Sequence, residues 1–118
     1  MEILLYKLKD IANIKEIIQI CKELNIKVSI IKRENTDIDY EGLSKKYNID
    51  IYDSFDTFLN YNGNKRFLFF ETYGDKLLHD VNLKDFDIFV FGAEDYGIPL
   101  YEIEKVKNKE IVKIPMKK

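Results

Sequence analysis

Tryptophan is absent from this 118-residue sequence, and cysteine, histidine, proline and glycine are scarce. The single cysteine, Cys21, excludes an internal disulfide, and it falls on the apolar stripe of an expected helix, which favours a core residue over a nucleophile. The single histidine, His79, lies in a polar stretch with no cysteine partner and is expected in an exposed loop. We therefore expect neither a metal site nor a histidine-activated nucleophile.

Long hydrophobic runs are also missing. No apolar stretch approaches the roughly 20 residues that cross a bilayer, and the first residues lack the basic start of a secretory signal. These absences predict a cytoplasmic protein without a membrane segment. Apolar residues make up 46% of the chain and charged residues 34%, which is typical of a folded domain. A chain of this length forms one core, so we expect a single domain over residues 1–118.

Neither sign of charge dominates, since 19 basic residues stand against 21 acidic ones and the net charge is −2. The chain as a whole is therefore not a strongly basic polyanion binder. Lysines are concentrated between Lys105 and Lys118, where Glu110 is the only acidic residue. This segment can contact phosphates, and the alternative is a solvated C-terminal segment with no ligand.

Strand-like and helix-like segments alternate along the chain, which predicts an α/β fold with a mostly parallel sheet and helices on both faces. Apolar runs predict strands at residues 3–6, 28–31, 50–53, 66–71, 88–91 and 111–116. Apolar spacing predicts a helix over 14–24, and weaker patterns predict helices near 42–47, 55–61 and 100–106. Asp10 and Ser54 are expected to cap two of these helices.

The stretch 87–116 organises the rest of the chain. Its strand, Ile88–Phe91, shows no alternation, as is typical of a strand buried on both faces. A loop with a glycine at each end, Gly92 and Gly97, follows the strand, and Pro99 then suits the first turn of a helix. Open α/β folds bind ligands at loops in this position, so the loop is the candidate site.

This pattern resembles the SPOUT superfamily of knotted RNA methyltransferases, and within it the branch that methylates tRNA ribose 2′-hydroxyls. The residues that carry the resemblance are Gly92, Glu94, Gly97, Ile114, Pro115 and Met116. It extends over most of the chain, because Asn13 falls on an asparagine of that branch and 71–74 resembles its loop after the fourth strand.

The resemblance implies an S-adenosylmethionine cofactor cradled by three loops, and it implies no metal. The implied cofactor-binding residues are Thr72, Gly74, Gly92, Glu94, Gly97, Ile114 and Met116. We expect these loops to converge at one edge of the sheet. Glu94 is expected to fix its loop by accepting backbone N–H bonds. The alternative interpretation is a surface carboxylate near the amino end of the next helix.

Two departures from the family pattern bear on catalysis. Gln19 stands where the branch carries a catalytic arginine, and Lys15 stands where it usually has glycine. Neutral Gln19 lacks the fixed positive fork of an arginine. In the family, Ile-Pro-Met leads into a final helix that threads the knot and forms much of the dimer interface, whereas this sequence ends shortly after Met116. We expect an incomplete knot, and a homodimer or a second chain that supplies this helix.

The sequence thus predicts a methyltransferase-like protein acting on RNA, with tRNA ribose as the implied target and with little or no turnover. No catalytic residue is identified, and Asn13 and Gln19 are named only because they fall on the family's asparagine and arginine positions. One alternative is a non-catalytic RNA-binding or protein-interaction module on the same fold. Another is an unrelated α/β enzyme with a phosphate-binding glycine loop, which is disfavoured because the sequence has neither Gly-x-Gly-x-x-Gly nor Gly-Lys-Ser/Thr.

Overall fold

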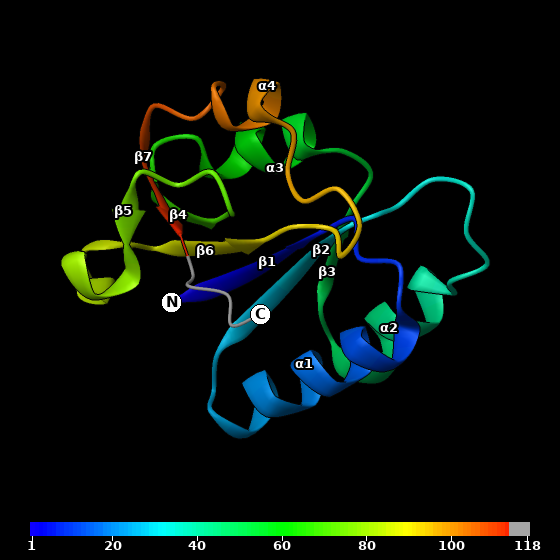
Figure 1. Ribbon diagram of the computed structural model, residues 1–118. Coiled ribbons are helices and arrows are strands. Elements are labelled where there is room, and N and C mark those ends of the chain that lie inside the picture. The colour runs from blue at the N-terminus through cyan, green and yellow to red at the C-terminus, as the bar shows by residue number, and fades with distance from the viewer. Residues whose placement is uncertain (114–118) are drawn as a thin grey trace, which may run out of the picture.

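The computed structural model describes residues 1–113, and these form one seven-stranded sheet in the order β3-β2-β1-β6-β4-β7-β5 (Figure 1). The strands are β1 (Glu2–Tyr6), β2 (Lys27–Ile31), β3 (Asp50–Tyr52), β4 (Arg66–Phe70), β5 (Lys76–Leu77), β6 (Ile88–Phe91) and β7 (Asn108–Lys113). All pairings between these strands are parallel. The expected α/β fold with a parallel sheet is confirmed, and the carboxyl ends of the strands meet at one edge.

Helices cover both faces of the sheet, as the alternating pattern predicts (Figure 1). On one face lie α1 (Ile11–Glu23) and α2 (Tyr40–Tyr47), and on the other lie α3 (Phe55–Asn62) and the short α4 (Leu100–Ile103). The carboxylate of Asp10 accepts the amides of Ala12 and Asn13 at the start of α1. Ser54 likewise accepts the amide of Thr57 in α3, so both expected N-caps are confirmed.

Two main cores flank the sheet because side chains alternate along each strand. In β1, Leu4 packs into the core under α3 and α4, and its neighbour Leu5 packs into the core under α1 and α2. The apolar stripe of α1 supplies Ile14, Ile18 and Cys21 to the second core. Cys21 is buried, which confirms its interpretation as a core residue.

The structure differs from the sequence-based expectation mainly in its last third. The α4 helix ends at Ile103 instead of continuing to residue 106, although Val106 is still buried after a turn. β7 begins at Asn108, before the apolar residues that predicted it, because its first half pairs with β4. The two-residue strand β5 and two short 3₁₀ turns, at 78–80 and 83–85, have no clear signal in the sequence. His79 lies in the first turn and is exposed, as expected.

Within residues 1–113, no helix is both long and apolar enough to span a membrane. The predicted strand end at Ile114, Pro115 and Met116 lies outside the described residues. The same holds for the prediction of an incomplete knot, which depends on the path of residues 114–118.

Candidate functional site

The loop after β6 is a tight turn closed on itself. Gly97 donates its amide to the carbonyl of Ala93 at 2.8 Å and has a φ of +68°, which L-residues with a side chain rarely adopt. A Cβ on Gly92 would lie 2.7 Å from the carbonyl carbon of Gly97. The two glycines of the motif therefore face each other across the loop, and each is required by its geometry.

Glu94 extends from this loop to the connection between β1 and α1. Its two carboxylate oxygens accept the amides of Lys9 at 2.9 Å and Asp10 at 3.1 Å. Burial raises the pKa of Glu94, but these amides, its own backbone and the Asn13 side chain outweigh burial and hold the pKa below its usual value. The expected role of Glu94 as an acceptor of backbone N–H bonds is confirmed, and the amides belong to the connection between β1 and α1.

Asp95 ties the same loop to the connection between β2 and α2. The guanidinium of Arg33 donates to both oxygens of Asp95, at 2.9 and 2.7 Å, and also to the carbonyl of Lys7 at 3.2 Å. Its charge also lies over the ring of Tyr96, 5.0 Å from the centroid. The hydrogen bonds from Arg33 hold the pKa of Asp95 well below its usual range. Sequence reasoning missed this ion pair because its partners are far apart in the chain.

A third connection comes from the loop after β4, where two side chains hold the backbone of Ile98. Glu71 accepts the Ile98 amide at 2.5 Å, and the Tyr73 hydroxyl donates to the Ile98 carbonyl at 2.5 Å. Burial, and secondly the charge of Glu71, raise the pKa of Tyr73 to about 12, so it donates as a neutral phenol at pH 7. The sequence placed Glu71 at a strand end and at the start of the 71–74 loop without assigning it a contact, and a carboxylate directly after four apolar residues is the signal that could have identified it.

The loops after β4 and β6 enclose a hollow of about 370 Å³. It is lined by Phe70, Glu71, Thr72, Gly92, Ala93, Glu94, Asp95, Tyr96 and Gly97. Ligand pockets in proteins commonly measure about 300–1,000 Å³, so a nucleoside-sized molecule fits. The predicted convergence is thus confirmed for Thr72 and the 92–97 loop.

Other predicted residues lie elsewhere. A Cβ on Gly74 would lie 2.5 Å from the Val112 carbonyl carbon, so this glycine allows close packing on β7 and does not line the hollow. Asn13 is in the first turn of α1, beside Glu94. Gln19 is on the exposed face of α1, more than a turn beyond Asn13, and it is not among the lining residues. The contribution of Ile114 and Met116 lies outside the described residues.

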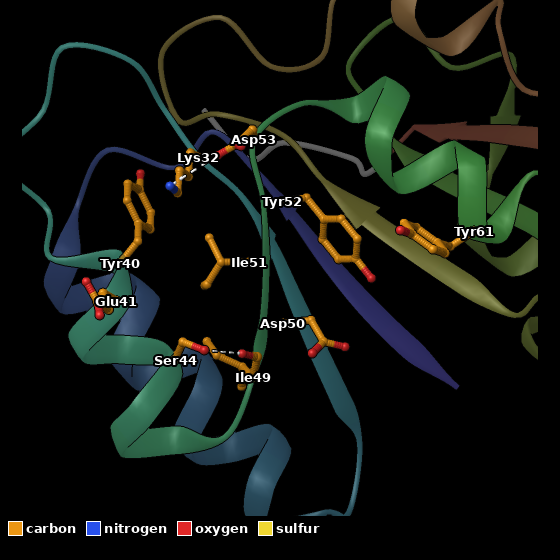
Figure 2. A pocket seen from close by; sticks show the side chains of 10 residues that line it. All are labelled: Lys32, Tyr40, Glu41, Ser44, Ile49, Asp50, Ile51, Tyr52, Asp53 and Tyr61. Atoms are coloured by element: carbon orange, nitrogen blue, oxygen red, sulfur yellow. Dashed lines mark hydrogen bonds and ion pairs between the residues drawn. The ribbon is translucent and has the colours of Figure 1, made fainter.

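A larger hollow, about 720 Å³, lies along the edge strand β3, between α2 and α3 (Figure 2). Tyr52 points toward Tyr61 on one side of the strand, and Ile51 points toward α2 on the other. Two aspartates that line this hollow form ion pairs: Asp50 with Lys27 at 3.4 Å and Asp53 with Lys32 at 3.1 Å. None of the motif residues lines this hollow, so its size does not make it the site suggested by the sequence.

Lysines border the site on its α1 side. Lys9, Lys15 and Lys46, together with Asp37 and Asp39, line a hollow of about 440 Å³ between α1 and α2, next to the amides that Glu94 binds. By contrast, Lys105, the first lysine of the basic C-terminal segment, is held by Asp56 at 2.8 Å and by Glu102 at 2.7 Å. Of these lysines, Lys9 is therefore the one next to the site, whereas Lys105 is engaged by two carboxylates.

Solved structures share this fold. A protein from Bacillus anthracis, assigned as an RNA methyltransferase, aligns with a TM-score of 0.78 at 25% identity, over 98% of this chain and 79% of that one. The SpoU methyltransferase AviRb from Streptomyces viridochromogenes, crystallised with the cofactor AdoMet, aligns with a TM-score of 0.74 at 14% identity, over 100% of this chain and 49% of that one. At 14% identity, the likeness shows the fold alone.

A sequence relative points in the same direction. The tRNA (cytidine(34)-2′-O)-methyltransferase of Saccharophagus degradans is 23% identical over 111 residues, which cover 88% of this chain and 72% of the relative. The SpoU rRNA Methylase family matches residues 1–118, from the first strand through the glycine-flanked loop to the last residue. The chain therefore belongs to the SpoU rRNA methylase family.

Proposed function

We propose that this protein binds S-adenosylmethionine between the loops after β4 and β6 and transfers its methyl group to a ribose 2′-hydroxyl of RNA. The observation that carries the proposal is that Thr72 and the 92–97 loop line the same hollow at the carboxyl edge of the sheet. A family match over 1–118 supports the same reaction. Since the relative named above acts on cytidine 34 of tRNA, tRNA is the substrate class that we propose.

The residues present fit this cofactor. Gly92 and Gly97 line the hollow and carry no side chains of their own, so backbone groups of this loop that are not already paired can approach a ligand closely. The Thr72 hydroxyl adds a donor and an acceptor. From the sequence pattern we also assign Ile114 and Met116 to this pocket. Bound S-adenosylmethionine would supply an electrophilic methyl group, and the surrounding loops would orient it and limit access of water.

Other residues near the hollow contribute by holding the 92–97 loop in place before a ligand binds. Glu94 and Asp95 each join the 92–97 loop to a different neighbouring segment, and Glu71 holds Ile98, the residue directly after the loop. A loop held from three sides loses little conformational entropy when a ligand binds, and less of the binding free energy is spent on ordering it. Glu94 also fixes the start of α1, where Asn13 is placed, so the cofactor loop and that segment keep a constant separation.

A second candidate function is a non-catalytic RNA-binding module. The observation that favours it is Gln19, which is neutral at the position where the resemblance implies an arginine. Without that charge, an alkoxide forming on the ribose would lose one electrostatic stabiliser.

Two assays separate the candidates. Calorimetry with S-adenosylmethionine tests the pocket, and transfer of a labelled methyl group to bulk tRNA tests the reaction. Binding together with transfer supports the methyltransferase. Binding of tRNA without heat from S-adenosylmethionine supports the second candidate, and failure of both ligands to bind would contradict the two proposals.

We also propose that the protein acts as a homodimer. Ile20 in α1 and Leu24 at the C-cap of this helix are 49% and 63% exposed, and they would contribute apolar area to such an interface. Light scattering coupled to size exclusion would give the mass, and a monomer at micromolar concentration would contradict this proposal.

A further inference from the structure

Glu71 is a carboxylate placed inside the candidate cofactor hollow. It follows β4 directly, is half-buried and lines the hollow together with Thr72 and Gly97. A Cβ at Gly97 would contact its carboxylate oxygens, so the glycine leaves room for the charge. Glu71 therefore faces the space where the ligand is proposed to bind.

This charge has no cationic partner within residues 1–113, where the ion pairs involve other carboxylates. Burial raises the pKa of Glu71, while hydrogen bonds from the amides of Ile98 and Thr72 oppose that shift. A partly desolvated carboxylate without a counter-charge is costly to a folded protein. The hydrogen bond to the Ile98 amide does not require a charged acceptor, because a neutral carbonyl oxygen can accept an N–H with the same geometry.

We infer that Glu71 binds a cationic group of S-adenosylmethionine, either its ammonium or its sulfonium. The inference deepens the proposed function and rests on it. The donor carries an ammonium and a sulfonium, whereas the product S-adenosylhomocysteine keeps the ammonium and loses the sulfonium. The two oxygens of a carboxylate can accept about four hydrogen bonds. The amides of Ile98 and Thr72 use two of these positions, so Glu71 can also accept a hydrogen bond from a ligand without releasing Ile98.

The contact would also link the ligand to the loop. The Ile98 amide binds Oε1 of Glu71, and Ile98 directly follows Gly97 and precedes the turn into α4. Neutralising the carboxylate with a ligand cation would remove the cost of the uncompensated charge while that hydrogen bond stays in place. Donor binding should then tighten the 92–97 loop.

The test compares Glu71→Gln with the unmodified protein by calorimetry, using three ligands: S-adenosylmethionine, S-adenosylhomocysteine and 5′-methylthioadenosine, which has neither cation. Glutamine keeps an acceptor for the Ile98 amide and removes only the charge. Glu104→Gln, at an exposed position after α4, is the matched control for net charge. Because a charge-assisted hydrogen bond is about twice as strong as a neutral one, we expect Glu71→Gln to weaken S-adenosylmethionine binding about tenfold.

Each outcome has one meaning. A loss confined to S-adenosylmethionine assigns Glu71 to the sulfonium, and a loss shared with S-adenosylhomocysteine assigns it to the ammonium, provided that 5′-methylthioadenosine binding is unchanged. Equal losses for all three ligands, or none, overturn the inference and leave Glu71 as a support of Ile98. If the unmodified protein binds none of the three, the proposed function itself fails.

Discussion

Arg33 and Asp95 form a two-pronged ion pair across the carboxyl edge of the sheet, with N–O distances of 2.9 and 2.7 Å between residues 62 positions apart in the chain. Arg33 follows β2, and Asp95 follows β6, which is separated from β2 by β1. The carbonyl of Lys7, after β1, also accepts from Arg33. One guanidinium thus joins the loops of three adjacent strands, and a bidentate pair fixes both distance and orientation.

Replacing Asp95 by Asn should lower the free energy of unfolding at neutral pH. The pKa of Asp95 is depressed, so its folded form binds fewer protons than the unfolded form, and its stabilising contribution is present above the ordinary Asp value near 4. The contribution is lost as pH falls through the lower folded pKa. Urea unfolding of both proteins between pH 2 and 7 checks this, and a stability gap that persists unchanged in acid would contradict it.

Replacing Gly97 by Ala should destabilise the protein by about 1–2 kcal/mol from its left-handed backbone alone. The added Cβ would also meet the Glu71 carboxylate, so the total cost should be larger. Urea unfolding measures the loss. In the double variant with Glu71→Ala the contact is absent, and the cost of Gly97→Ala should fall toward the backbone value. Strict additivity of the two substitutions would show that the contact has no effect.

Much of the fold was predictable because local and tertiary preferences agree. Ile88–Phe91 is apolar without alternation and lies in the centre of a parallel sheet, and the stripe of α1 packs as its spacing indicates. The sequence did not predict strands that form only because they pair with a neighbouring strand. The first half of β7 is polar, yet it is a strand because it pairs with β4, and the two residues of β5 pair with β7.

The position of the candidate site was predictable, but the hydrogen bonds and the ion pair that hold its loop were not. The glycines show by their spacing that a tight loop follows β6, but nothing local indicates that Glu94 binds the amides after β1 or that Arg33 reaches Asp95. These contacts join residues brought together only by the strand order. The contact of Glu71 was also missed because its partner Ile98 lies 27 positions away, although the place of Glu71 directly after four apolar residues is a local signal.

Glu71 should make stability depend on pH in the sense opposite to Asp95. Its pKa is raised by burial, against the amides of Ile98 and Thr72, so the folded state binds more protons than the unfolded one. Stability should therefore decline as pH rises from the ordinary Glu value near 4.3 through the raised folded value. Thermal unfolding of Glu71→Gln should lack this decline. A difference between the two proteins that is constant from pH 4 to 8 would count against a perturbed carboxyl.

RNA binding should depend on two lysines that line the same hollow, Lys15 in α1 and Lys46 in the last turn of α2. Lys15 and Lys46 line one hollow beside the site, whereas Lys45 in the same helix pairs with Glu41 at 3.2 Å. For single-stranded RNA, each phosphate contact contributes about −0.7 to the slope of log K against log salt, so Lys15→Gln and Lys46→Gln should each flatten the slope by about that amount. Lys45→Gln is the control. Should only substitutions at Lys107 or Lys113 change the slope, the C-terminal segment would be the phosphate contact.

Turnover should be low in the unmodified protein and should rise in Gln19→Arg. Gln19 is exposed on α1 and does not line the hollow, so the substitution should leave S-adenosylmethionine affinity unchanged. An arginine would supply a preorganised positive charge for the attacking oxygen, and one such contact is typically worth about 10² to 10³ in rate. Gln19→Lys should give a smaller rise, because a lysine lacks the planar fork. The turnover of the unmodified protein and of the two variants is measured as transfer of a labelled methyl group to bulk tRNA at saturating S-adenosylmethionine. Rapid transfer by the unmodified protein would mean that another group stabilises the alkoxide, and a rise in neither variant would mean that residue 19 does not reach the reacting ribose.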